Sequence, residues 1–157
     1  MRQFSFFFLL LLLACDSPSP VGEESLARHP EAEALIQCLQ RFFYAASQYD
    51  FQDMQAQCEA GFRFSEGGKD WSLEELRSFM EPDRGKVLIQ YELKNPSVQV
   101  KLPLAWVHYQ NQAVQKENQQ TKHINWRQSA VLKKENESWK LVRIESTRLN
   151  TQVDIFF

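Results

Sequence analysis

SLEELRSFMEPDRGKVLIQYEL, residues 72–93, contains the point at which the hydrophobic pattern of the chain changes its period. Ser72 and Glu75 have the spacing of a capping box, in which each side chain satisfies an exposed amide at the start of a helix. Pro82 predicts the end of that helix, because proline cannot continue its hydrogen bonding. From Lys86 onward, apolar residues alternate with polar or smaller ones, which is typical of a strand. Helix therefore gives way to sheet just before Lys86.

The sequence before this stretch carries a longer helical pattern. The run EAEALIQCLQRFFYAASQYD, residues 31–50, follows a proline and begins with two glutamates, a composition typical of a helix start. Asp50 is expected to cap a second, shorter helix that contains Cys58 and ends at Gly61. Apolar residues of the first helix recur every three or four positions, as on one helix face: Leu35, Cys38, Leu39, Phe42, Ala46 and Tyr49.

The sequence from Lys86 to Leu149 predicts five runs of strand separated by polar turns or proline. We expect a turn at Asn95-Pro96, an interruption at Pro103, and further turns in the polar segments at 116–120 and 135–137. Long adjacent strands with short turns favour an antiparallel meander. Because the helices come first and the strands afterwards, the predicted class is α+β.

This order of elements resembles the nuclear transport factor 2-like (NTF2-like) superfamily, specifically its SnoaL-like and DUF4440-like branch. The matching stretches are the long helix ending in Tyr49-Asp50-Phe51, the helix start from Gly67-Gly68 to Ser72, Ala105-Trp106-Val107, and residues 139–147. The resemblance implies a cone, in which N-terminal helices pack in a curved antiparallel sheet and leave a pocket at the open end. It also implies a dimer through the outer sheet face in many members, and isomerase, dehydratase or cyclase activity in some.

The first fifteen residues have the parts of a bacterial lipoprotein signal. Arg2 precedes an apolar run of about ten residues, whereas a helix that spans a membrane needs roughly 20. Leu12-Leu13-Ala14-Cys15 resembles a lipobox, which implies that Cys15 becomes the first residue and carries the lipid. Multiple acyl chains on one cysteine meet the requirement for stable anchoring. An ordinary signal peptide with a chance cysteine is the alternative.

This interpretation divides the chain into four parts and places it in the bacterial cell envelope. The lipid would anchor it to a membrane, with the choice between inner and outer membrane left open. Cys38 and Cys58 then either pair as a disulfide or remain free thiols in apolar surroundings. The four parts are a signal peptide (1–14), the lipidated cysteine with a flexible tether (15–29), the NTF2-like domain (30–149) and an apolar C-terminal tail (150–157). We expect the tail to dock on the domain or at a dimer contact.

Charge and motif content argue against some classes of function. The chain has 18 basic and 20 acidic residues, and no basic stripe is visible, so we do not expect it to bind nucleic acid. The three histidines show no paired ligand spacing, so no metal site is predicted. No nucleophile elbow, phosphate loop or other cofactor motif is present, so no cofactor is expected.

Aromatic and charged side chains in the predicted helices and strands are candidates for the pocket. Glu145 stands where SnoaL-like members often carry a histidine, and it either acts as a base or, as we favour, pairs with Arg143 or Arg127. His108 is either a general base or, as we favour, a sheet residue packed beside Trp106. Aromatics at these spacings are more often core than pocket. The candidates are Tyr44, Phe62, Trp71, Tyr91, His108, Trp126, Arg143 and Glu145.

We therefore expect a non-catalytic envelope lipoprotein whose SnoaL-like domain binds a small apolar ligand or another envelope protein. One alternative is a periplasmic enzyme of isomerase, dehydratase or hydrolase type that uses Glu145 or His108. A second alternative is a dimeric scaffold with a filled cone. An open pocket with converging Glu145 and His108 would favour the enzyme, an open pocket without them would favour binding, and a filled cone would favour the scaffold.

Overall fold

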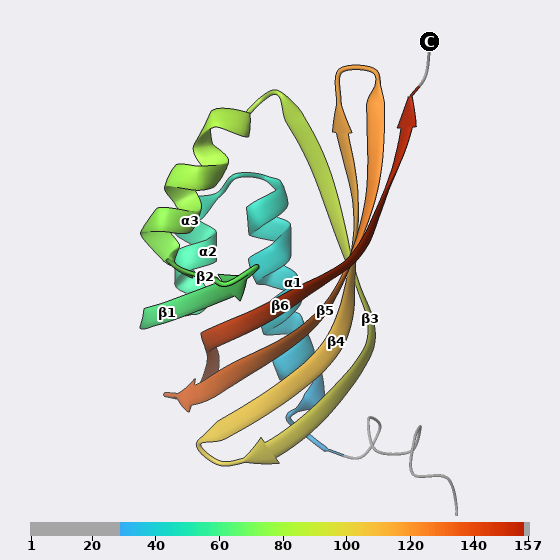
Figure 1. Cartoon of the computed structure of the whole chain (residues 1–157). Helices are drawn as coiled ribbons and strands as arrows, with labels where there is room; N and C mark the ends of the chain where they lie inside the picture. The colour runs from blue at the N-terminus through green and yellow to red at the C-terminus, as the bar shows by residue number, and fades with distance from the viewer. Residues whose placement is uncertain (1–28, 156–157) are drawn as a thin grey trace, which may run out of the picture.

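The structure, a computed structural model, describes residues 29–155. Three helices and two short strands precede four long strands, so the predicted α+β order is confirmed (Figure 1). The predicted signal peptide, Cys15 and the tether up to residue 28 lie outside the described residues. The elements are α1 (Ala32–Ser47), α2 (Phe51–Ala56), β1 (Cys58–Glu66), β2 (Lys69–Ser72), α3 (Leu73–Met80), the 3-10 helix η1 (Glu81–Asp83), β3 (Val87–Lys101), β4 (Leu104–Glu117), β5 (Gln120–Glu135) and β6 (Ser138–Ile155).

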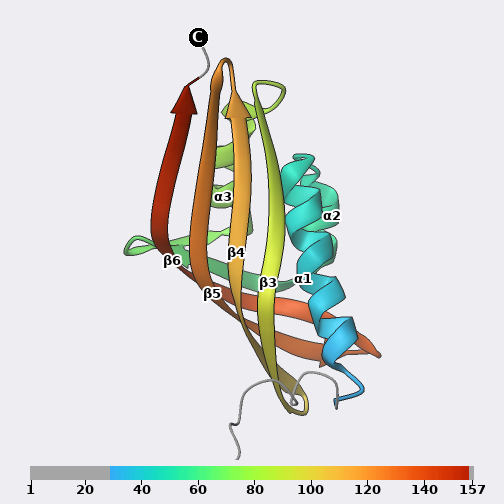
Figure 2. The same cartoon turned by 90° about the vertical axis from the view of Figure 1, so that its right-hand side faces the viewer.

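The six strands form one curved sheet in the order β2-β1-β6-β5-β4-β3. Strands β3 to β6 make the expected antiparallel meander. Strand β1 instead pairs with β6 in parallel, so the sheet is mixed rather than wholly antiparallel. The parallel pairing is possible because β2, α3 and strands β3 to β5 lie between β1 and β6 in the chain. The three helices lie on the concave face of the sheet (Figure 1 and Figure 2).

Helix α1 supplies the centre of the core. Leu35, Leu39 and Phe42 are at most 1% exposed, so the apolar stripe predicted for this helix faces the sheet. The inner sheet face meets it with buried residues from β4, β5 and β6, among them Val107 and Leu141. No helix within residues 29–155 combines the length and apolarity required to cross a membrane.

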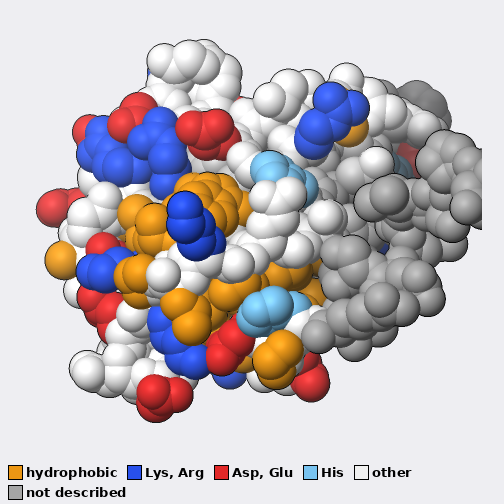
Figure 3. Space-filling view, turned by 90° about the horizontal axis from the view of Figure 1, so that it is seen from below, with side chains coloured by type: hydrophobic (Ala, Val, Ile, Leu, Met, Phe, Trp, Pro, Cys, Tyr) orange, Lys and Arg blue, Asp and Glu red, His pale blue; other side chains and the backbone are white. Residues whose placement is uncertain are grey.

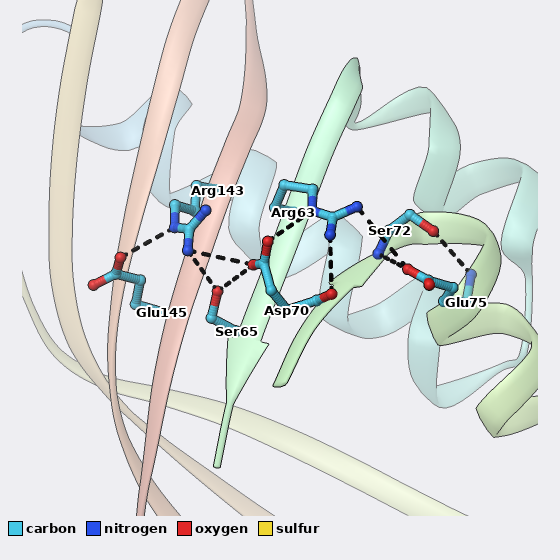
Figure 4. A network of polar contacts seen from close by, with 7 residues as sticks. All are labelled: Arg63, Ser65, Asp70, Ser72, Glu75, Arg143 and Glu145. Atoms are coloured by element: carbon cyan, nitrogen blue, oxygen red, sulfur yellow. Dashed lines mark hydrogen bonds and ion pairs between the residues drawn. The ribbon is translucent and has the colours of Figure 1, made fainter. Parts of the chain in front are cut away.

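The predicted start of α3 is confirmed. The Glu75 amide donates to the Ser72 hydroxyl at 3.2 Å, and the Ser72 amide donates to the Glu75 carboxylate at 2.7 Å. The hydrogen bonds from Ser72 hold the pKa of the Glu75 carboxyl below its usual value. Both hydrogen bonds can be followed in Figure 4.

Two local boundaries differ from the prediction. Asn95-Pro96 makes no turn, because β3 runs through it with a bulge between Lys94 and Ser97. Proline is tolerated at a bulge, where no ladder hydrogen bond from its nitrogen is needed. Cys58 and Gly61 lie in β1 rather than in a helix, since α2 ends at Ala56.

The predicted C-terminal tail is largely a continuation of strand β6. Residues 150–155 keep their pairing with β5, with Val153 opposite Lys122 and Ile155 opposite Gln120. The sheet therefore extends beyond the predicted domain boundary at residue 149. Phe156 and Phe157 lie outside the described residues.

Candidate ligand-binding site

A cavity of about 320 Å³ lies between helices α1 and α3 and the inner face of the sheet. Such a volume is at the lower end of the range of roughly 300–1,000 Å³ that is usual for ligand pockets. The cone is thus open, although only a small molecule would fit inside it. Its walls are mainly apolar and include Phe42, Phe43, Leu76, Ile89 and Trp126.

Three buried polar side chains form a hydrogen-bonded row beside this cavity. Asn111 Nδ2 donates to Gln128 Oε1 at 3.2 Å, and Gln128 Nε2 donates to Ser146 Oγ at 3.0 Å. All three residues are less than 10% exposed. They come from the neighbouring strands β4, β5 and β6 and point to the inner face because each stands between outward-facing neighbours. We call this row, together with Glu66, the polar relay.

Glu66 closes the polar relay at the end of β1. The Ser146 hydroxyl donates to its Oε2 at 3.1 Å, while Trp126 Nε1 donates to its Oε1 at 3.1 Å. The Arg148 guanidinium lies 3.1 Å from the same Oε1 and stacks over the Trp126 ring at 5.6 Å. The carboxylate is therefore held by three donors at the wall of the cavity.

At the other end of the polar relay, Asn111 Oδ1 has no hydrogen-bond partner among residues 29–155. Asn111 is 1% exposed and lines the cavity, so this is a buried acceptor left unpaired. An unpaired buried polar atom costs roughly 1–3 kcal/mol, and each such atom calls for an explanation. The Tyr109 hydroxyl is also unpaired within the described residues, but Tyr109 is not among the residues that line the cavity.

Tyr91 and Trp126 are the two predicted pocket residues that line this cavity. Burial raises the pKa of the Tyr91 hydroxyl above its usual range, so Tyr91 meets a ligand as a neutral phenol. Phe62 packs in the core against Phe42 with ring centroids 5.4 Å apart, and Trp71 packs on Phe79 at 5.2 Å. Tyr44 is 70% exposed on α1, outside this cavity.

His108, Arg143 and Glu145 lie on the outer sheet face, which corrects their placement in the pocket. The strand register explains this, because Glu145 stands between the buried Ile144 and Ser146 and so points the other way. His108 and Glu145 share one row across β4, β5 and β6, two strand spacings or ~10 Å apart. They do not converge on the cavity.

Charged side chains on the outer face of the sheet form ion pairs with one another, and Glu145 pairs with Arg143, as we favoured. Arg143 Nε lies 3.0 Å from Glu145 Oε1, and Arg143 Nη2 donates to Ser65 Oγ at 2.8 Å (Figure 4). Asp70 joins Arg143 to Arg63 through contacts of 3.3 and 2.9 Å. The Ser65 hydroxyl and then Arg63 keep the pKa of the Asp70 carboxyl below its usual value. These exposed pairs add little stability.

Cys38 and Cys58 are free thiols and form no disulfide with each other. The structure therefore agrees with the second of the two alternatives, free thiols in apolar surroundings. Cys38 Sγ donates to the Trp139 carbonyl at 3.3 Å. Burial raises the pKa of Cys38 to about 11 and raises that of Cys58 as well.

Within residues 29–155, no cluster of three His, Cys, Asp or Glu side chains has the geometry to hold a metal ion.

We predict that both thiols of the folded protein resist alkylation by iodoacetamide at pH 8 and react rapidly in denaturant, because only the thiolate attacks. Peptide mass spectrometry after alkylation measures each site separately. The raised Cys38 pKa also predicts that the free energy of unfolding falls as the pH rises from 9 through about 11, since the unfolded thiol ionises first. Blocked alkylation in denaturant without reductant would instead reveal a disulfide.

The residues of the polar relay were not among the sequence candidates. Asn111 and Gln128 carried a signal, because each replaces an apolar residue at an inward position of an alternating strand. Ser146 has the same signal between two outward-facing residues. Glu66 had none, because it precedes the Gly67-Gly68 turn and nothing in the local pattern gives its direction.

A family model described as a SnoaL-like domain matches residues 35–147. The chain belongs to this SnoaL-like family. Solved structures with a similar fold include one named as a ketosteroid isomerase-like protein and one named as a putative scytalone dehydratase. A comparison with curated proteins gave no match.

Solved structures place the SnoaL-like domain in the NTF2-like fold. An NTF2-like protein from Cytophaga hutchinsonii is 13% identical with a TM-score of 0.66, over 77% of this chain and 100% of that one. A ketosteroid isomerase-like protein from Erwinia carotovora atroseptica is 16% identical with a TM-score of 0.63, over 78% and 98%. A CamKII hub homology domain from Chlamydamonas reinhardtii is 14% identical with a TM-score of 0.67, over 76% and 98%. At these identities the similarity establishes the fold alone.

Proposed function

We propose that this chain is an envelope lipoprotein whose SnoaL-like domain binds a small, mostly apolar ligand inside the cone. The observation that carries the proposal is the cavity, which aromatic and aliphatic side chains line together with Asn111, a residue whose Oδ1 has no partner among the described residues. A mainly apolar pocket with a few placed polar groups is the usual form of a small-molecule site. A ligand that donates to Asn111 would remove the cost of its unpaired oxygen.

The arrangement of charged groups supports binding over catalysis. Glu66, a carboxylate in the cavity wall, is already held by Trp126, Ser146 and Arg148. His108 and Glu145, on which the enzyme hypothesis rested, lie on the opposite face of the sheet. Among the described residues that line the cavity there is neither histidine nor cysteine. The isomerase-like neighbour supports the enzyme alternative only through its fold.

Native mass spectrometry of the full chain purified from its own host tests the binding proposal. We expect a bound small molecule on the wild-type protein and none on an Ala46→Phe variant, because Ala46 lines the cavity and a phenyl ring there would occupy it. Ala60→Phe, on an exposed position of β1, is the matched control and should retain the ligand. Melting curves establish that both variants fold. A wild-type protein without added ligand mass, or an Ala46→Phe variant with the same added mass as the wild type, would contradict ligand binding in the cone.

Cell fractionation tests the membrane anchor independently. The Cys15→Ser variant should lose its association with membranes, since the lipid attaches to that thiol and stable anchoring depends on acyl chains. Wild-type protein processed in the same host is the control. Membrane association that survives the substitution would contradict the lipid anchor and leave the ligand-binding proposal untouched.

A contact with a second protein is the other candidate function. Figure 3 shows hydrophobic side chains gathered between acidic and basic ones on the face seen from below, and exposed apolar patches often mark protein contacts. Some structural neighbours are named as hub or association domains, which favours a homodimer as the partner arrangement. Light scattering of the full chain would decide this, because a monomeric mass at micromolar concentration contradicts the homodimer.

A further inference from the structure

The direction of every hydrogen bond in the polar relay follows from its Glu66 end. An ionised carboxylate only accepts, so the Ser146 hydroxyl must donate its proton to Glu66 Oε2. Ser146 Oγ can then only accept from Gln128, which requires the amide NH₂ of Gln128 to face it. The orientation of a buried amide is assigned through its partners in this way.

The same reasoning fixes the orientation of the Asn111 side-chain amide. With its NH₂ on Ser146, Gln128 presents Oε1 to Asn111, and only the NH₂ of Asn111 can donate to that oxygen. The carbonyl oxygen of Asn111, a residue that lines the cavity, is thereby left as a buried acceptor without a partner in the described part of the chain. The Glu66 carboxylate on β1 thus determines that Asn111 on β4 is left with an unpaired acceptor and not with an unpaired donor.

We infer that Glu66 determines ligand specificity through the polar relay, so that the cavity selects apolar molecules carrying a hydroxyl or N–H donor over those carrying only an acceptor. This inference rests on the proposed binding function and specifies the ligand class. A ligand with only an acceptor would leave Asn111 Oδ1 unpaired and place a second acceptor beside it. Discrimination of this kind is characteristic of sites with buried polar groups.

The Glu66→Gln substitution should reverse the direction of the hydrogen bonds in the polar relay. Trp126 Nε1 and Arg148 are donors only, so they would hold the amide oxygen of the new side chain and turn its NH₂ toward Ser146. Ser146 would then donate to Gln128, Gln128 would donate to Asn111, and the NH₂ of Asn111 would become its unpaired group. The variant should therefore prefer acceptors.

Calorimetric titration of the full chain with three bicyclic probes of similar size tests the inference. Indole carries an N–H donor, 1-indanone carries a carbonyl acceptor, and indene carries neither. We expect the wild-type protein to bind indole roughly tenfold more tightly than the other two probes, and Glu66→Gln to bind 1-indanone most tightly. Glu145→Gln makes the same chemical change on the outer face, outside the cavity, and should keep the wild-type order.

A second variant serves if Glu66→Gln does not fold. Ser146→Ala interrupts the polar relay, so the Gln128 amide loses its fixed orientation and indole and 1-indanone should bind within about twofold of each other. Equal affinities of the wild-type protein for all three probes would overturn the inference while leaving the cavity a binding site. Failure of all three probes to bind the wild-type protein would overturn the proposed function and this inference together.

Discussion

Replacing Phe42 by alanine should lower the free energy of unfolding by about 3–5 kcal/mol, the usual cost of truncating a buried phenylalanine. Phe42 is 1% exposed. Its ring packs edge-on against Phe43, with ring centroids 5.3 Å apart, and in a tilted arrangement against Phe62, with centroids 5.4 Å apart. The vacated space would join the existing cavity rather than collapse, because the same ring forms part of its wall. Urea denaturation monitored by circular dichroism measures the change.

Tyr44→Ala is the control for this prediction, two positions further along α1. Its ring is 70% exposed, so its removal should change the free energy of unfolding by no more than about 0.5 kcal/mol. Similar losses for the two variants would mean that α1 presents a different face to the sheet from the one described here.

Replacing Gln128 by leucine should cost about 1–3 kcal/mol of stability, although the two side chains are similar in size and leucine is more apolar. Gln128 is 4% exposed, and its loss leaves the NH₂ of Asn111 without its acceptor. Binding of indole should weaken in the same variant, because Asn111 is no longer held in one orientation. Urea denaturation measures the first effect, and calorimetric titration measures the second.

Gln110→Leu is the matched control, since Gln110 is exposed on the outer face of β4. We expect its stability to stay within about 0.5 kcal/mol of the wild-type value. A Gln128→Leu variant as stable as this control would show that Asn111 finds another partner and that the polar relay contributes nothing to stability.

The features that the sequence predicted are those encoded in short stretches. The stripe of α1 and the capping box at Ser72 depend on residues within a few positions of one another, so local spacing was sufficient. The pattern of residues 138–149 likewise predicted a strand. Their extension to Ile155 was missed, because the polar residues at 150–152 resemble a strand end more than a strand middle.

The candidate site was harder to predict because it is made by register between distant strands. His108 stands between the buried Val107 and Tyr109 and so faces outward, which the alternation of this strand could have indicated. The convergence of Asn111, Gln128 and Ser146, by contrast, requires the alignment of three strands. The position of Glu66 requires in addition the parallel pairing of β1 with β6, which no local pattern encodes.

That pairing also affects the order in which the protein can fold. Glu66 and Ser146 are 80 positions apart in the chain, so β1 has no neighbour on that side until β6 has been synthesised. Pairing between such distant segments is slow, because the intervening chain must first be brought together. The sheet is therefore completed only after translation of its final strand.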